Sequence, residues 1–511
     1  VNIALKLSEA GSLKFNDPDF QQFNSQERQK LFLQAPLDKN PYPQVLSGFH
    51  LIDPASGELV PRYFHLFPLW LTVFFKLWRF SGMFAANTLF GVLSVLILVP
   101  LGQRLFGSRL VGLSSAGLLA NNMGQIWIVR SPFSEILAQV FLLAGIWILS
   151  IGMIENRKRY CILAGFLFGL TLFVRVDSLL ILAALLIFAW LSFLVQVEIR
   201  SLHFPLVPFL ITLSLAIAYA SLHTVMFALP YFSNVTDVLA SSLFIPSSLT
   251  FAAGFCFFLI LSFKVRARLV GFFSSETIRT RTFFLLCLIV TGLFAYAYFI
   301  RPHLQPRKDY IPLPFPQTGS VRFYDEINLV RLGWYLSPLG LLLGYLGSLI
   351  LLRRAVKERV LALRPFLLVL GFFSLFYLYK SRAFPENYWV IRRYVEIVIP
   401  GFLMLASLTV VSFFDAGKCI DLAKWVPDIH KERPTPSPSR EGNQYNRSTA
   451  WLPILRVVSV IAFLVLAGWQ LKASYPLLAQ TEWEKTFSQL AGLAGANRDA
   501  DVLLLERGQF Q

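Results

Sequence analysis

The chain has 511 residues, of which 56% are hydrophobic and only 15% charged, and 49 of them are Phe. A soluble chain of this length usually carries more surface charge, and it lacks repeated apolar runs of about 20 residues, the length that crosses about 30 Å of hydrocarbon. The net charge is +17. Membrane proteins hold Lys and Arg in cytoplasmic loops, and no basic stripe with interleaved aromatic residues occurs outside the loops, so we expect no nucleic-acid partner.

The first 80 residues form a predicted extracytoplasmic loop with an interfacial helix. Residues 1–65 are polar and rich in turn formers such as "DKNPYPQ". Residues 66–80 are apolar but short, and Lys76 and Arg79 interrupt them, which favours a helix lying in the membrane interface over a span. The first residue is Val, and the sequence begins in mid-pattern, so we expect a span upstream of it.

Residues 81–414 form the predicted transmembrane core, and a last transmembrane helix follows at residues 451–472. The twelve predicted spans cover residues 84–103, 110–129, 132–152, 160–174, 178–196, 204–226, 247–263, 283–300, 331–351, 365–380, 392–414 and 451–471. The Pro/Ser-rich stretch 415–450 is predicted to be a disordered cytoplasmic linker, and residues 473–511 an extracytoplasmic tail from a truncated domain. The predicted fold class is therefore all-α, a polytopic transmembrane helical bundle with a long extracytoplasmic first loop.

Loop charge predicts the orientation of the bundle. One alternating set of loops carries about twice as many Lys and Arg residues as the other. This assigns the basic set to the cytoplasm of a plasma (inner) membrane. Residues 1–80, the turn at 130–135, residues 175–177, and the loops 301–331 and 380–393 then face outward. The Pro-rich and basic loop 301–331 suits a lid over an anionic group, with an ordinary solvated loop as the alternative.

The candidate site residues lie on this outward face, where charge close to hydrocarbon is unfavourable. Glu135 begins a span, where the helix dipole alone favours a carboxylate; the functional reading is a carboxylate at a cavity floor, with Arg130 one turn earlier. Arg175 and Asp177 lie between two apolar runs, either as a helix break with a snorkelling Arg or as binding groups.

Two further candidates complete the set. Arg392 and Arg393 begin a late span, with Glu396 one turn further in, and a guanidinium suits a pair of phosphate oxygens; membrane anchoring in an aromatic belt is the alternative. His65 lies where the polar first loop meets the membrane, as a ligand or phosphate contact or as a capping residue. The four Cys and six His show neither CxxC nor HExxH, so we predict no metal site.

The segments "YFHLFPLW", "GQRLFGSRLVGLSSAGLL", "AGFLFGLTLFVRVDSLLIL" and "RRYVEIVIPG", with the opening "VNIALKLSEAGSL", together resemble the GT-C superfamily over residues 1–410. The likeness is to family 39-like enzymes, which include protein O-mannosyltransferases and the lipid A aminoarabinose transferase. It implies inverting transfer of a hexose or pentose from a polyprenyl-phosphate donor to a lipid, glycan or protein acceptor, on the outer face and among membrane lipids. It requires no cofactor and leaves a divalent cation open.

The resemblance also assigns roles. The family's principal base precedes the segment matching "VNIALKLSEAGSL", so it is expected upstream of Val1. Glu135 matches a second acidic residue after an outer Arg, and Arg393 an arginine at the outer end of a late span. His65 matches a histidine before Pro, although "HLFP" is one residue longer than the family's HxP.

Other classes of membrane protein stay open. The main alternative is a transporter or flippase of lipid-linked sugars, which would more often show inverted repeats and helices broken at mid-membrane. An O-antigen ligase or polymerase would concentrate its polar residues in one large late outer loop. A purely structural membrane protein would not need arginines on the outward face. An apolar helix followed by Asp or Glu upstream of Val1 would favour the transferase.

Overall fold

The computed structural model describes residues 1–16, 22–24, 32–33, 44–45, 48–53, 56–196, 205–231, 275–304, 310–312, 320–322, 324–381, 387–415 and 452–479. The α-helices are α1 (Asn2–Ala10), α4 (Leu66–Phe106), α5 (Arg109–Ala120), α6 (Met123–Val129), α7 (Glu135–Ile154), α8 (Lys158–Thr171), α9 (Leu179–Gln196), α10 (Leu206–Phe227), α14 (Glu276–Ala295), α15 (Asn328–Leu336), α16 (Pro338–Leu352), α17 (Arg364–Tyr379), α18 (Asn387–Tyr394), α19 (Val398–Phe414) and α20 (Leu452–Ala479). Short 3-10 or π-helical segments are η1 (Val176–Ser178), η2 (Tyr296–Ile300), η3 (Arg301–His303), η4 (Asp325–Ile327), η5 (Arg353–Lys357) and η6 (Leu361–Leu363).

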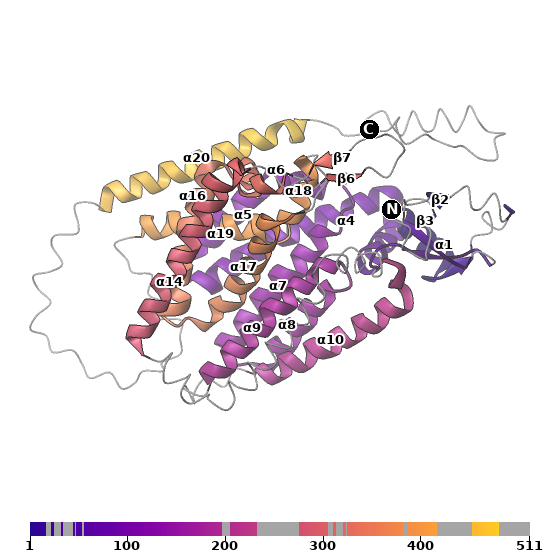
Figure 1. Ribbon diagram of the computed structural model, residues 1–511, viewed down its shortest axis with the longest axis horizontal. Helices are drawn as coiled ribbons and strands as arrows, with labels where there is room; N and C mark the ends of the chain where they lie inside the picture. The colour runs from indigo at the N-terminus through magenta and orange to yellow at the C-terminus, as the bar shows by residue number, and fades with distance from the viewer. Residues whose placement is uncertain are drawn as a thin grey trace, which may run out of the picture.

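The long helices run side by side as an elongated bundle, with α1 and the first strands at one end of it (Figure 1). Within the described residues, 7 helical segments are long and apolar enough to cross a membrane. They are Leu66–Phe106, Glu135–Ile154, Leu206–Phe227, Glu276–His303, Pro338–Lys357, Leu361–Tyr379 and Pro453–Ala479. The chain is therefore a multi-pass membrane protein, and the predicted all-α polytopic class is confirmed.

Every predicted span that falls on described residues is helical, but several are shorter or more broken than predicted. The predicted span 110–129 is two helices, α5 and α6, separated at Asn121 and Asn122. With 12 residues, α5 covers about 18 Å at 1.5 Å per residue, which is too short to cross a bilayer. Likewise α8 has 14 residues, and Ser337, at φ 74°, separates α15 from α16 within the predicted span 331–351. The predicted span 247–263 lies outside the described residues.

The first membrane helix, α4, covers both the predicted interfacial helix 66–80 and the predicted span 84–103, and it has a kink between them. Trp78 (φ −135°, ψ 21°) and Arg79 (φ 56°, ψ −144°) have non-helical backbone inside α4. The segment before them ends at the position where Lys76 and Arg79 interrupt the apolar run. That the earlier segment lies in the membrane interface stays a prediction.

The described residues of the segment 1–65 contain regular secondary structure that the predicted polar loop did not include. They form α1 and an antiparallel sheet with strand order β1-β5-β4-β3-β2. Its strands are β1 (Phe15–Asn16), β2 (Phe32–Leu33), β3 (Gln44–Val45), β4 (Phe49–Asp53) and β5 (Glu58–Pro61). Leu51 pairs with Leu59, and both are buried. A second hairpin pairs β6 (Tyr310–Pro312) with β7 (Ser320–Arg322) inside the predicted lid.

The helices approach closely where small residues meet. A Cβ atom at Gly347 of α16 would collide with the backbone carbonyl of Leu405 in α19, so only glycine permits this approach. A Cβ at Gly102 of α4 would lie 2.5 Å from the Cα of Gly112 in α5. These contacts hold α16 against α19 and α4 against α5.

The last helix is longer than predicted. α20 continues to Ala479, seven residues past the predicted end at 472, and Pro476 lies inside its last turns. The rest of the predicted tail, 480–511, and residues 416–450 of the predicted linker lie outside the described residues.

Candidate functional site

Buried charged residues from distant parts of the chain meet at one end of the bundle. Because successive helices alternate in direction, the start of α7, the turn between α8 and α9, the end of α17 and the break between α18 and α19 lie at the same end. The side chains that meet there form what we call the charged cluster: Glu135, Arg175, Asp177, Arg392, Arg393 and Glu396.

Arg175 lies at the centre of the charged cluster. Its backbone is extended (φ −149°, ψ 146°), because α8 has ended and η1 has not begun. Its Nη1 is 2.5 Å from Glu135 Oε1, its Nη2 2.5 Å from Asp177 Oδ2, and its Nε 2.5 Å from Glu396 Oε1. The exposed fraction of these carboxylate side chains is at most 10%. One guanidinium therefore lies within ion-pair distance of carboxyl groups from three separate segments.

The other two arginines lie at the edge of the cluster. Arg392 Nε donates to Glu135 Oε1 at 2.6 Å, and Arg393 Nη1 donates to Asp177 Oδ2 at 2.6 Å. Their side chains keep 28% and 32% exposure, against 9% for Arg175. The Arg392 guanidinium also lies over the ring of Phe133, 4.6 Å from its centroid. Each of these arginines is therefore paired with a buried carboxylate and still exposes about one third of its side chain.

Asp177 is the acceptor shared by the most donors in the cluster. Its Oδ2 accepts from Arg175, from Arg393 and, at 2.6 Å, from the hydroxyl of Tyr377. Tyr377, near the end of α17, is only 1% exposed. Charge-assisted hydrogen bonds of this length are among the stronger ones in proteins, so Asp177 fixes Arg393 relative to α17.

Glu135 keeps one oxygen unused. Its Oε2 is buried and has no hydrogen-bond partner among the described residues. A buried polar atom of this kind is unfavourable unless something else binds it. Among the described residues, no group of three or more His, Cys, Asp and Glu side chains is placed to hold a metal ion.

The structure brings together Glu135, Arg175, Asp177, Arg392 and Arg393, but not Arg130 or His65. Arg130 instead donates from Nη1 to the carbonyl of Leu477 in α20. The functional roles of all seven residues remain predictions.

In the predicted lid, Arg301 donates from Nη1 to the carbonyl of Leu378 at 2.7 Å, so the start of the lid is bound to the end of α17.

Glu396 and Tyr377 were not among the predicted site residues. Glu396 carried a usable signal, because a carboxylate one turn inside an apolar span needs a buried partner. Tyr377 carried none, since the sequence "FYLYK" also fits an aromatic residue at a membrane interface.

His65, a buried residue just before α4, contacts a half-buried histidine of α10. His65 Nδ1 and His223 Nε2, in α10, are 2.9 Å apart. The next amide, of Leu66, donates to the carbonyl of Phe173, two residues before Arg175. His65 is 1% exposed, and burial, with a smaller contribution from His223, lowers its pKa from 6.5 to about 4. The imidazole is therefore neutral at pH 7.

This pair predicts a stability that depends on pH. Because the folded-state pKa of His65 lies below its unfolded value, its contribution is complete above pH 6.5 and is lost as the pH falls towards 4, by up to about 3 kcal/mol. We expect the melting temperature of the detergent-solubilised protein to fall more between pH 7 and pH 4.5 than that of His65→Gln. His303→Gln, at an exposed position, serves as control. Parallel curves for wild type and His65→Gln would contradict the assignment.

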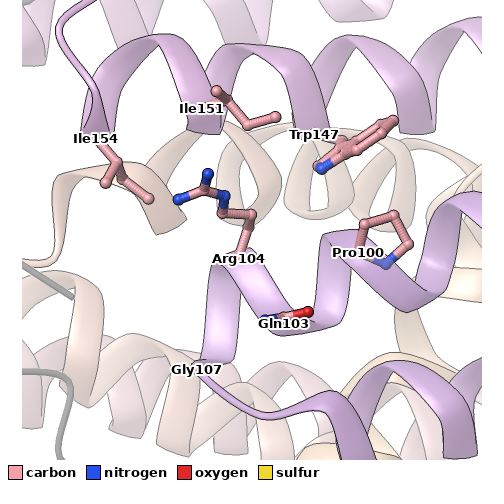
Figure 2. A pocket seen from close by; sticks show the side chains of 7 residues that line it. All are labelled: Pro100, Gln103, Arg104, Gly107, Trp147, Ile151 and Ile154. Atoms are coloured by element: carbon pink, nitrogen blue, oxygen red, sulfur yellow. The ribbon is translucent and has the colours of Figure 1, made fainter. Parts of the chain in front are cut away.

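A cavity of about 240 Å³ lies near the opposite end of the bundle, between α4 and α7. Figure 2 shows Arg104 reaching into it from α4, with Trp147 and Ile151 on the α7 side. Arg104 Nη2 is 2.5 Å from Glu155 Oε1, so this guanidinium already has a carboxylate partner. The residues that line this cavity include no member of the charged cluster, which is the stronger candidate because it gathers more buried charge.

No family model and no curated protein matches this sequence. Among solved structures, the oligosaccharyltransferase of Archaeoglobus fulgidus in its apo form is similar, with 14% sequence identity and a TM-score of 0.45 over 96% of this chain. The chain spans 58% of the length of that protein. ArnT from Cupriavidus metallidurans bound to undecaprenyl phosphate is also found, with 12% identity and a TM-score of 0.28 over 69% of each chain. These are proteins of the kind that the sequence resemblance predicted, but neither likeness is close enough for function to be carried over.

Proposed function

We propose that this protein is a membrane glycosyltransferase of the GT-C type, which moves a sugar from a polyprenyl-phosphate donor to a lipid, glycan or protein acceptor on the outer face of the plasma membrane. One observation carries the proposal. Two arginines, Arg392 and Arg393, are held rigidly by buried carboxylates at one end of a membrane bundle and remain about one third exposed.

The chemistry of the transfer suits these groups. When the bond between the anomeric carbon and the phosphate oxygen breaks, negative charge grows on the polyprenyl phosphate. Guanidinium groups that are already fixed stabilise that charge without reorganising during the step. Arg393 uses Nη1 for Asp177 and has further N–H donors for a pair of phosphate oxygens.

The acceptor hydroxyl must lose a proton as it attacks the opposite face of the anomeric carbon, which gives inversion. A carboxylate near the reacting bond serves as base. The sequence resemblance assigns this role to an acidic residue upstream of Val1. Among the residues that the structure describes, Glu135 Oε2 is a buried carboxylate oxygen without a hydrogen-bond partner, and we assign it to orienting the acceptor or the sugar.

A lipid-linked donor fits the bundle's surroundings. Helix α14 has no buried residue, and in α10 residues such as Val207, Leu215 and Val225 are more than 60% exposed, so these helices present apolar surface to lipid. A polyprenyl chain is accommodated in the same hydrocarbon. We therefore assign the donor phosphate to the membrane surface, at the depth where helix ends and their charged side chains are found.

The alternative, a transporter or flippase of lipid-linked sugars, fits the same helices less well. Coupling and substrate sites of such proteins lie near the bilayer midplane, between broken helices. The charged cluster instead lies where several helices begin or end. A transporter would move the donor across the membrane without releasing polyprenyl phosphate.

The deciding experiment uses full-length protein reconstituted in liposomes with radiolabelled polyprenyl-phosphate sugars. We expect protein-dependent release of polyprenyl phosphate together with a labelled product on acceptors extracted from the source membrane. Mass spectrometry of envelope glycans from a deletion strain then identifies the sugar and acceptor. Movement of intact donor between leaflets without release would favour the flippase and contradict the transferase.

A further inference from the structure

The break between α18 and α19 carries the accessible part of the charged cluster. Arg392 and Arg393 precede it in α18, and Glu396 lies within it. Ile397, at the start of α19, has a non-helical backbone (φ −146°, ψ −26°). A break in a membrane helix leaves carbonyl groups without their helical partners, and such groups need donors from elsewhere.

Gln139 supplies one of these donors. Its Nε2 donates to the carbonyl of Val395 at 2.6 Å, in the middle of the break. Gln139 is fully buried and lies one turn after Glu135 on α7. The same helix therefore holds this segment twice, through Glu135 on the Arg392 side chain and through Gln139 on the Val395 backbone.

A second amide fixes the orientation of the first. Gln125 of α6 donates from Nε2 to Gln139 Oε1 at 2.9 Å, and Gln139 donates from Nε2 to Gln125 Oε1 at 3.0 Å. Gln125 is 3% exposed. Since a buried amide is unfavourable without partners, this reciprocal pair holds the Gln139 Nε2 in the direction of Val395.

We infer that Gln139, oriented by Gln125, is a positioning residue that sets the geometry of Arg392 and Arg393 for the donor phosphate. The inference rests on the proposed function and deepens it. Gln139 acts through the backbone of the break, where its side chain donates to the carbonyl of Val395.

The chain offers a matched control at the other side of α6. Asn122 Nδ2 donates to Gln470 Oε1 at 3.0 Å, and Gln470 Nε2 donates to the carbonyl of Tyr335 at 3.2 Å. Gln470 is also fully buried, but its hydrogen bonds join α20 to Asn122 and to the end of α15. Gln139→Met and Gln470→Met therefore each replace a fully buried amide, which donates to a backbone carbonyl, by an apolar side chain of similar volume.

The experiment measures binding of a fluorescent, sugar-free polyprenyl phosphate to full-length protein in nanodiscs, with hydrogen exchange of residues 387–397 recorded in parallel. We expect both variants to lower the melting temperature, but only Gln139→Met to weaken binding, by about tenfold, which corresponds to one lost hydrogen bond to a positioned group. Only Gln139→Met should speed exchange in the break. Gln125→Met should give a smaller loss, and the double variant no more than Gln139→Met alone.

Equal binding by Gln139→Met and Gln470→Met would overturn the positioning role, and so would unchanged exchange in the break of a folded Gln139→Met protein. The proposed function fails in a different way. If wild-type protein binds no probe at all, the donor assignment is wrong; if wild type binds and Gln139→Met binds equally well, only the role of Gln139 is wrong.

Discussion

Replacing Arg175 by Met is expected to lower the free energy of unfolding more than any other single change in the charged cluster. The variant leaves Glu135, Asp177 and Glu396 buried around an apolar side chain, with the central cation gone. Removing one partner of a buried ion pair typically costs about 3–5 kcal/mol. We expect most of the protein to be lost as aggregate when it is extracted, as seen by size-exclusion chromatography with fluorescence detection.

Arg353→Met serves as the control for Arg175→Met. Arg353 Nε is 3.2 Å from Glu358 Oε1, but its side chain is 64% exposed. An exposed pair of this kind contributes at most about 1 kcal/mol, so this variant should elute and melt like wild type. If Arg175→Met also did so, its carboxylates would have to be compensated in another way, and the structural importance of the central guanidinium would be refuted.

Replacing Arg393 by Ala is expected to reduce sugar transfer by about 10²–10³-fold, the effect of removing one preorganised donor from a developing anion. The fold should survive, because Arg393 is 32% exposed and Asp177 keeps Arg175 and Tyr377 as partners. The measurement is the initial rate of polyprenyl phosphate release in liposomes. Arg393→Lys should recover only part of the rate, since an ammonium group lacks the planar pair of donors.

Arg456→Ala, which removes an exposed cation at the opposite end of the bundle, should transfer at the wild-type rate. A folded Arg393→Ala protein with full activity would remove Arg393 from the mechanism. If activity were lost together with the melting transition, the loss would instead report on stability. Both quantities therefore have to be measured on the same preparation.

Apolar run length was sufficient to predict the described helices that are long enough to span a membrane, because such a helix must be continuous and apolar over about 20 residues. It was insufficient for the breaks. Asn122 ends one run by capping α6 with its own side chain, and Ser337 does the same for α16. In the sequence, a single polar residue inside an apolar run does not by itself indicate that a helix ends there. The small sheet was missed because strands such as β1 and β2 have only two residues, too few for an alternating pattern.

The candidate site was predicted as a set of charges on one face, and its pairing was not. Arg130 and Arg175 have similar surroundings in the sequence, both next to a turn between apolar runs. The structure directs Arg175 into the bundle and Arg130 towards Leu477 of α20. Which arginine turns inward depends on how each helix is rotated about its axis, and that rotation is set by packing of many apolar residues rather than by any local pattern.

The charged cluster contains as many guanidinium groups as carboxylates, so its own field cancels within a few ångströms. Long-range electrostatic attraction from these six side chains is then too weak to draw an anionic donor from a distance. The donor would have to arrive by lateral diffusion in the bilayer and meet the arginines only at contact. The cluster's own contribution to the donor's encounter rate should accordingly change little with the ionic strength of the buffer.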